Sequence, residues 1–289
     1  MRVVESYGAD VDIIPGRLVR ASLGPRCGAS GEMKSREVAM GRSRAEVAAE
    51  IAEQTSKVAF PDSRFGRDFS QFIPSFEGAD IAAQGVMATS ERQLAKRVFV
   101  TPDNAVSAVR QKLIQQGVDL VVPSYGLHRG FLEIAVEAIP TSAIAHAGWL
   151  DFIEYYGRSL ALKALAVSGP IDLIVTGASA ITLEGLRFGM GDFYLDIEWP
   201  ILRALGLVTD RTPVIAVVHD AQLTDLAIES APSNVTADLI VTPAYTLRPP
   251  VHARPTGLDW SIVPPHLIQT ATLQEFRQYS SGAPDLPSH

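Results

Sequence analysis

Val118-Asp119-Leu120-Val121-Val122-Pro123 is the stretch that decides the fold, because it is an almost continuous aliphatic run directly after Gly117. Its length is that of a strand, and such runs suit strands buried on both faces, as in parallel sheets. Similar runs recur along the chain, at residues 171–176, 213–218 and 239–242. The pattern therefore predicts a parallel sheet that is covered on both sides by helices.

Helical segments alternate with these runs. Before the deciding stretch, residues 97–101 form a short β-rich run, and Pro102-Asp103-Asn104 then opens a helix with Asp103 as a candidate N-cap. Another helix is expected to stop before Gly206, a residue type favoured just after a helix end. Helices are expected over residues 34–57, after Gly78, over 102–116 and over about 195–205. The alternation predicts a three-layer α/β fold with a doubly wound, Rossmann-like parallel sheet.

One folded domain is expected over residues 33–262. Residues 1–32 are rich in glycine without a sustained period, and we expect a leader without regular structure there. The alternative is that Met33 is the natural start. Residues 263–289, where proline is frequent, are expected to form a C-terminal tail.

Composition argues against several classes of protein. The formal net charge is −7 and the isoelectric point about 5.4, which disfavours nucleic acid as the main partner because phosphate binding needs clustered Lys and Arg. No apolar stretch approaches the roughly 20 residues that a membrane-spanning helix needs. Cys27 is the only cysteine, so the chain forms no internal disulfide. We expect a cytoplasmic protein with a small-molecule substrate, and its oligomeric state is not readable from the sequence.

Ligands of such sheets bind beyond the carboxyl ends of the strands. Three segments of the chain occupy such positions. They are residues 123–131, residues 176–179 together with 187–196, and residues 219–222. We therefore look for the functional site among these segments.

The second segment holds the loop Gly189-Met190-Gly191, which leads into a helix. Glycines let the backbone approach a ligand, and a helix N-terminus presents free N–H groups to an anion. The same glycines also suit a tight turn between a strand and a helix. From the residues alone, both interpretations stay open.

Several motifs, in order over residues 34–260, resemble one family. Residues 189–196 (Gly-Met-Gly-Asp-Phe-Tyr-Leu-Asp) resemble the Gly-x-Gly-Lys/Gly-Gly-Tyr-Tyr-Asp loop of 5-formyltetrahydrofolate cyclo-ligases. Ile73-Pro74-Ser75-Phe76-Glu77-Gly78-Ala79 is similar to a stretch of the longer, cyclo-ligase-like branch. The other matching segments are residues 101–103, 123–131, 172–177, 219–222 and 238–243.

The resemblance implies a NagB/RpiA/CoA-transferase-like fold and a reaction that uses ATP and Mg²⁺. In the family, the formyl oxygen of 5-formyltetrahydrofolate is phosphorylated, ring closure follows, and 5,10-methenyltetrahydrofolate forms. The resemblance also implies catalytic roles for Tyr194 and Asp196. It implies nucleotide or phosphate contacts for Lys34, Arg36, Gly189, Met190, Gly191, Asp192 and Phe193.

The loop departs from the family pattern at three positions. Asp192 stands where the family has Lys or Gly, Phe193 stands where it has Gly, and Leu195 replaces the second Tyr. A carboxylate repels a triphosphate by about 1 kcal/mol at 4 Å in water, and by several-fold more near a protein surface. Asp192 has two alternative roles: it binds Mg²⁺ together with Asp196, or it caps the following helix.

Further candidates lie in the strand-end loops. Arg129 is a candidate clamp for a carboxylate or phosphate, and is added to the catalytic set. His219 and Asp220 form either an acid–base pair or a structural pair. Tyr155 and Tyr156, with Trp149 and Phe152, either line a pterin-sized pocket or pack in the core. The candidate substrate-binding residues are Glu77, Pro123, His128, Gly177, His219, Asp220 and Gln222.

Three functions remain open. The altered loop favours a divergent enzyme that acts on a folate-like or other small anionic molecule. The ordered motifs are also compatible with a true ATP- and Mg²⁺-dependent 5-formyltetrahydrofolate cyclo-ligase. The third possibility is a non-catalytic protein that binds a small molecule in the same pocket.

Overall fold

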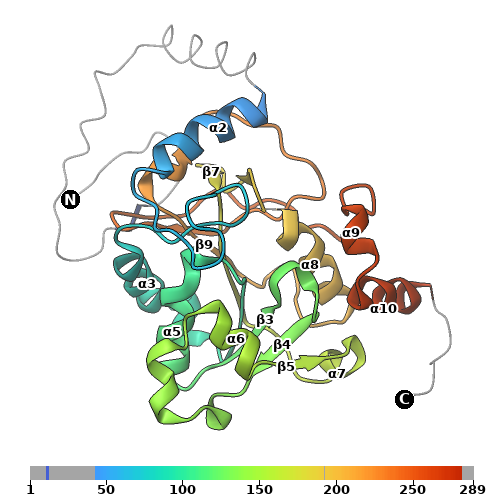
Figure 1. The fold of residues 1–289 in the computed structure, drawn as a ribbon. Helices are drawn as coiled ribbons and strands as arrows, with labels where there is room; N and C mark the ends of the chain where they lie inside the picture. The colour runs from blue at the N-terminus through green and yellow to red at the C-terminus, as the bar shows by residue number, and fades with distance from the viewer. Residues whose placement is uncertain (1–10, 13–42, 192, 282–289) are drawn as a thin grey trace, which may run out of the picture.

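The computed structural model describes residues 11–12, 43–191 and 193–281 (Figure 1). Its helices are α2 Arg44–Thr55, α3 Ala79–Ala88, α4 Ser90–Leu94, α5 Ser107–Gln115, α6 Leu150–Tyr156, α7 Leu162–Ala166, α8 Phe193–Ala204, α9 Pro265–Ile268 and α10 Ala271–Ser280. Short 3-10 helices are η1 Asn104–Val106, η2 Tyr125–Leu127, η3 Val136–Ala138, η4 Thr141–His146 and η5 Asp220–Gln222. The strands are β1 Val11–Asp12, β2 Arg97–Val100, β3 Asp119–Pro123, β4 Phe131–Ile134, β5 Arg158–Leu160, β6 Leu173–Gly177, β7 Ala180–Thr182, β8 Arg187–Phe188, β9 Val214–Val217, β10 Leu223–Thr224, β11 Leu239–Val241 and β12 Thr246–Leu247.

The main sheet has nine strands in the described part of the chain, in the order β1-β12-β11-β9-β6-β2-β3-β4-β5. The neighbours from β11 through β9, β6 and β2 to β3 are parallel, and the strands at both edges are antiparallel. Val98 of β2 pairs with Leu120 of β3 on one side and with Leu173 of β6 on the other. The chain passes from β2 to β3 and then crosses back to β6. The order therefore reverses between β2 and β6, which makes this point the topological switch.

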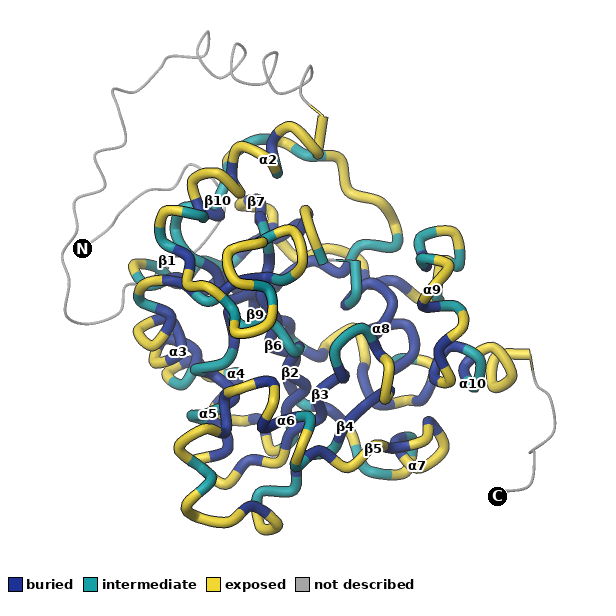
Figure 2. The backbone as a smooth tube through the Cα atoms, in the orientation of Figure 1, coloured by how far each residue is buried: buried dark blue, intermediate teal, exposed yellow. Residues whose placement is uncertain are grey.

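Alternate residues of each central strand enter two different cores. In β2, Val98 and Val100 pack with α3, α5 and α6, whereas Phe99 packs with α7, α8 and α10 on the other face. In β3, Leu120 belongs to the same core as Val98, and Val121 belongs to the same core as Phe99. The central strands β6, β9 and β11 are buried along their length (Figure 2). The predicted three-layer α/β fold with a parallel central sheet is confirmed.

A smaller sheet, in the order β10-β7-β8, lies beside the main one. Helix α2 covers it (Figure 1). Val47 and Ile51 of α2 pack on Ala180 and Phe188. Ser43 begins α2 with a capping box, because its side chain accepts from the N–H of Glu46 and the Glu46 carboxylate accepts from the N–H of Ser43. Residues 34–42 of the helix expected here lie outside the described residues.

Two segments differ from expectation. Residues 263–289 were expected to form a tail, but α9 and α10 lie within them. The core on the α8 side of the sheet contains three buried residues of these helices: Leu267, Leu273 and Phe276. Apolar residues at helical spacing therefore make this segment helical, although it contains prolines. Asp103 was expected to cap a helix with its side chain; it occupies the cap position of η1 without that bond, because its carboxylate is engaged elsewhere. Apart from β1, which pairs with β12, the leader lies outside the described residues.

No helix in the described ranges is both long and apolar enough to cross a membrane.

Candidate functional site

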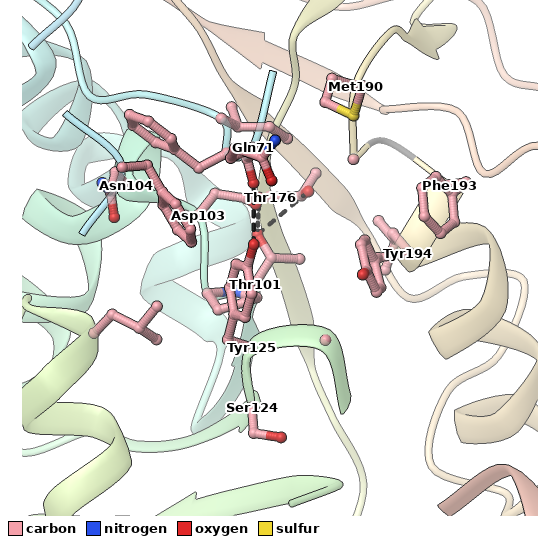
Figure 3. Close-up of a pocket in the computed structure, with 18 of the residues that line it drawn as sticks. Gln71, Thr101, Asp103, Asn104, Ser124, Tyr125, Thr176, Met190, Phe193 and Tyr194 are labelled. Atoms are coloured by element: carbon pink, nitrogen blue, oxygen red, sulfur yellow. Dashed lines mark hydrogen bonds between the residues drawn. The ribbon is translucent and has the colours of Figure 1, made fainter. Parts of the chain in front are cut away.

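A cavity of about 500 Å³ lies at the topological switch. Thr101, Ser124 and Thr176, which line it, stand at the carboxyl ends of β2, β3 and β6 (Figure 3). The loop over residues 62–73 and the start of α8 complete its walls. Of the three segments that the sequence singles out, the first two contribute to this cavity and the third does not.

Aromatic rings form two walls of the cavity. On one side Phe65 packs on Phe72 and Tyr125, with ring centroids 5.9 and 5.7 Å apart. On the α8 side Phe193 and Tyr194 are stacked at 4.5 Å with an angle of 25° between their planes (Figure 3). Stacked rings on both sides of a cavity favour a flat ligand.

Hydroxyl and carboxyl groups meet at the strand ends. Asp103 accepts a hydrogen bond from the Thr101 hydroxyl at 2.5 Å (Figure 3). It also accepts one from the Gly177 N–H at 3.1 Å. A side chain at Gly177 would bring its Cβ within 3.0 Å of Ala105 Cβ and 3.1 Å of Ile73 Cγ2. Only glycine fits there without displacing the segment that carries Asp103.

Burial raises the pKa of Asp103, while its hydrogen bonds from Thr101 and Gly177 and the charges of Arg110 and Arg187 act in the opposite direction. Arg110 is fully buried, and its pKa falls to about 10 because burial disfavours its charge. It donates to the carbonyl oxygens of Thr101 at 2.7 Å and of Asp103 at 2.8 Å. Arg110 therefore fixes the backbone on both sides of Pro102.

Glu198 is a site residue that the sequence analysis missed. It lines the cavity although only 1% of its surface is exposed, and its Oε2 has no hydrogen-bond partner within the described part of the chain. Its pKa is raised to about 8, mainly by burial and also by the charges of Asp103 and Asp196, while the charge of Arg187 opposes the rise. The signal in the sequence was a charged residue inside the apolar run Ile197-Glu198-Trp199. It stands four residues after Tyr194, which places both on one face of α8.

The glycine loop borders the cavity as expected. Gly189 and Gly191 have φ angles of 114° and 78°, which other residues rarely adopt. Met190 is half exposed, and its carbonyl oxygen accepts a hydrogen bond of 2.6 Å from the Ser179 hydroxyl. Met190, Gly191 and Phe193 line the cavity, whereas Gly189 does not. Asp192, Lys34 and Arg36 lie outside the described residues, so their predicted contacts stay predictions.

Tyr194 and Asp196 point to different sides of α8, because residues two apart on a helix do not share a face. Tyr194 lines the cavity, and its pKa is raised by burial and by the neighbouring Tyr125 and Glu198. Asp196 does not line the cavity. It is buried and accepts from Arg187 at 3.0 Å, from Asn234 at 2.8 Å and from the Val235 N–H at 2.8 Å.

Among the described residues, no group of three or more His, Cys, Asp or Glu side chains is arranged to hold a metal ion. The lining that the structure describes contains no lysine. Its two arginines are each near a carboxylate: Arg64 lies 3.4 Å from Asp151, and Arg187 is paired with Asp196.

His128 lines the cavity, but its neighbour Arg129 does not. The Arg129 guanidinium pairs with the Glu154 carboxylate at 3.1 Å and donates to the carbonyl oxygen of Gly157 at 3.1 Å. Pro123 is buried in β3, opposite Phe131 of β4. The predicted role of Arg129 as a clamp for a carboxylate or phosphate stays a prediction, and so does the predicted contact of Pro123 with a substrate.

The third segment lies beyond β9, away from the cavity lining. His219 Nδ1 accepts from the Ala221 N–H at 3.0 Å, and Asp220 accepts from the Thr242 hydroxyl at 2.6 Å. Gln222 is buried and donates to the Ala178 carbonyl oxygen at 2.5 Å. These bonds hold the turn after β9. Glu77 is exposed before α3 and is also outside the lining.

The aromatic group near α6 does not form the pocket. Tyr155 and Trp149 are 80% and 59% exposed, whereas Phe152 is buried in the core with Tyr156 packed against it. None of these four lines the cavity. Phe65 and Phe72 are aromatic residues of the site that sequence reasoning missed, and the phenylalanines of the irregular stretch 61–74 were their only signal.

Comparisons with known proteins agree with the resemblance seen in the sequence. The human methenyltetrahydrofolate synthase domain-containing protein is 29% identical over 204 residues, which are 68% of this chain and 51% of that protein. The zebrafish (Danio rerio) protein with the same description is 27% identical over 209 residues, covering 70% and 53%. The chain spans about half the length of these relatives.

Two solved structures are similar at low identity. The NMR structure of Aquifex aeolicus 5,10-methenyltetrahydrofolate synthetase has a TM-score of 0.40 and 14% identity, covering 76% of this chain and 98% of that one. A 5,10-methenyltetrahydrofolate synthetase from Mycoplasma pneumoniae has a TM-score of 0.39 and 15% identity, covering 67% and 94%. A model of the 5-formyltetrahydrofolate cyclo-ligase family matches residues 41–243, which is more than half of the chain. This chain therefore belongs to the 5-formyltetrahydrofolate cyclo-ligase family.

Proposed function

We propose that this chain is a divergent enzyme of the family, which acts on a folate-like or other small anionic molecule without ATP-driven phosphoryl transfer. The observation that supports this proposal most is the distribution of groups in the cavity. Flat aromatic walls surround its interior, and the uncharged or acidic groups of Thr101, Asp103 and Glu198 line it. Such an interior suits a heteroaromatic ring with hydrogen-bonding atoms at its edge.

The rim of the cavity differs from its interior. Arg64, His128 and His266 line it and are exposed. Arg64 also lies over the Tyr125 ring, 5.9 Å from its centroid. Basic side chains at the mouth suit a carboxylate that extends outward from a bound ring. A folate combines these two parts, a flat ring system at one end and carboxylates at the other.

The altered loop supports the part of the proposal that excludes ATP-driven phosphoryl transfer. Phosphoryl transfer is catalysed mainly by positioning and by cations that balance the phosphate charge. Phe193 lines the wall where the family pattern has glycine, and its stacking on Tyr194 occupies space beside the loop. The described lining offers no lysine, and Arg187 is already paired with Asp196. This arrangement favours a ring over a triphosphate next to α8.

The test is calorimetric titration of 5-formyltetrahydrofolate and of Mg·ATP, each alone and together. We expect the folate to bind without ATP, Mg·ATP not to bind, and no methenyl-folate chromophore to form. The double change Asp192→Lys with Phe193→Gly should restore Mg·ATP binding if the loop alone blocks it. Chromophore formation by the unchanged protein would instead identify a true cyclo-ligase.

A matched pair of variants tests the cavity itself. Phe65 lines the cavity, whereas Phe69 of the same loop packs on Phe72 with a centroid distance of 5.7 Å and does not line it. Phe65→Ala should weaken folate binding by about tenfold, because one stacking partner is lost, and Phe69→Ala should change it little. If both variants weakened folate binding equally, the folate would not be bound against Phe65 in this cavity. Folate binding without any conversion of the ligand would support a non-catalytic binding protein.

A further inference from the structure

The mouth of the cavity is completed by a C-terminal segment that lies beyond the family match. The family model matches residues 41–243, whereas Pro264 and His266, at the start of α9, line the cavity. Helices α9 and α10 lie on the α8 side of the sheet (Figure 1). The segment over residues 264–280 therefore adds a part of the wall that the matched residues do not supply.

This segment is held against the rest of the site by α10. The hydroxyl of Thr272 lies so close to Gly130 that a Cβ at Gly130 would be 2.6 Å from it. The Glu275 carboxylate accepts a hydrogen bond of 2.8 Å from the Leu162 N–H. Because Gly130 follows His128 by two residues, α10 packs on the turn that carries a second histidine of the cavity mouth.

The two histidines of the mouth differ from the other histidines of the chain. Five of the six histidines lie in the described ranges, and three of these have contacts of their own: His146 with the Trp149 ring, His219 with the Ala221 N–H, and His252 with the Glu184 carboxylate. The side chains of His128 and His266 line the cavity and are exposed, and neither forms a hydrogen bond or ion pair with another described residue. An imidazole carries at least one N–H group in either protonation state. The mouth thus offers two unengaged donors to a ligand.

The other groups of the cavity leave an anion no better place. Carboxyl groups of Asp103 and Glu198 line the interior, where they offer no partner to a negative charge. Arg64, the remaining basic group of the mouth, already lies 3.4 Å from the Asp151 carboxylate. Hydrogen bonds from N–H groups to a carboxylate are stronger than those between neutral groups. A ligand with a flat ring and a carboxylate is therefore expected to place the ring inside and the carboxylate at the two histidines.

We propose that residues 264–280 are a specificity element, in which His266, together with His128, binds the distal carboxylate of a ligand whose ring occupies the interior. The substrate class is then a flat ring extended by an arm that ends in a carboxylate, and loss of that charge makes a poorer ligand. The folate used as a probe rests on the proposed function. The assignment of the two histidines to an anion does not depend on it.

Calorimetric titration with two forms of 5-formyltetrahydrofolate tests the proposal: the compound itself, and a diamide in which both glutamyl carboxylates are converted to amides. His266→Ala and His128→Ala should each weaken binding of the carboxylate form by about three- to tenfold, because a hydrogen bond to a charged group is lost. Binding of the diamide should stay within about twofold, since it lacks that charge. His266→Glu should weaken the carboxylate form further, because like charges repel. His252→Ala, an exposed change outside the cavity lining, is the matched control and should affect neither form.

Two results would overturn the proposal: His266→Ala weakens binding of the carboxylate form and the diamide equally, or it weakens neither. If neither compound binds to the unchanged protein, the proposed function fails, and titration with glutarate, a free dicarboxylate, decides about the histidines. The imidazole ¹H–¹⁵N NMR signals that are lost in His128→Ala and in His266→Ala should then shift together on addition of glutarate, while the His252 signal stays in place. The absence of any shift at His128 and His266 would reject the anion site.

Discussion

Asp196 and Glu198 lie two residues apart on α8, and the helix turns them to different sides. At about 100° per residue, Glu198 shares a face with Tyr194, whereas Asp196 faces away from it. Asp196 consequently meets Arg187, Asn234 and Val235 outside the cavity. We infer that Asp196 joins α8 to β8 and to the chain before β11, and that Glu198 is the carboxyl group available to a ligand.

Asp196→Ala should therefore affect stability more than ligand binding. It leaves the Arg187 guanidinium, whose side chain is 2% exposed, without its buried partner. We expect the free energy of unfolding to fall by about 3–5 kcal/mol, as measured by urea denaturation. Asp196→Asn, which keeps the shape, should lose less and secures a folded sample.

The control for this experiment is Asp210→Ala. Asp210 pairs with Arg203, which is also on α8, but Asp210 is exposed, so solvent screens the pair and stability should hardly change. The contradicting outcome is that Asp196→Ala is as stable as the unchanged protein and loses Mg²⁺ binding, as measured by calorimetry. Asp196 would then have the metal-binding role that the resemblance implies.

At the scale of elements, the loop over residues 62–73 carries the wall opposite α8 although it has no regular structure. Asp62 ties it to the floor of the cavity by accepting from the Asn104 amide at 2.8 Å. The same carboxylate accepts from the backbone N–H groups of Arg64 and Phe65 at 2.7 and 3.2 Å. One side chain therefore positions both the loop and the ring of Phe65.

Asp62→Ala should loosen this wall. We expect faster hydrogen exchange of the loop amides and folate binding weakened by about three- to tenfold, because hydrogen bonds worth about 1 kcal/mol each are lost. Asp68→Ala is the matched control, since Asp68 bonds only within the loop, to Ser70. An exchange pattern in Asp62→Ala like that of the control would show that the wall is held by other contacts.

At the scale of the whole molecule, the sequence predicts the sheet better than the site. Continuous apolar runs such as 118–123 predicted the parallel strands, because burial on both faces demands them. The strand-end rule predicted the cavity segments 123–131 and 187–196, but it also included residues 219–222. The latter follow β9, one strand beyond the switch between β6 and β2, and strand order is a tertiary property that no local pattern reveals.

Sequence reasoning missed several site residues because only the tertiary packing shows that their side chains meet at the cavity. Phe65 and Phe72 lie in an irregular loop, where no period indicates which side chains face inward. Asp103 follows a proline before a helix, so capping explained it locally, and only the fold brings the Gly177 N–H to it from β6. The sequence marks Glu198 only as a charged residue inside the apolar run 197–199, and the packing was needed to show that it is buried and lines the cavity.

The buried Glu198 also makes a prediction for the stability of the whole molecule. Its pKa is about 8 in the folded protein and 4.5 as an isolated side chain. Below pH 4.5 the carboxyl group is protonated in both states and costs nothing extra. Between these values the unfolded chain releases a proton that the folded protein keeps, so stability falls as the pH rises, by up to about 1.4 kcal/mol per pH unit.

Glu198→Gln removes this titration and leaves the other ionisable groups in place. The difference in free energy of unfolding between the variant and the unchanged protein should therefore grow in favour of the variant from pH 5 to pH 8 and level off above pH 8. Urea denaturation at each pH measures this difference, and groups that titrate alike in both proteins cancel from it. A difference that stays constant with pH would mean that Glu198 is already ionised in the folded protein, and that Asp103 and Asp196 do not hold its proton.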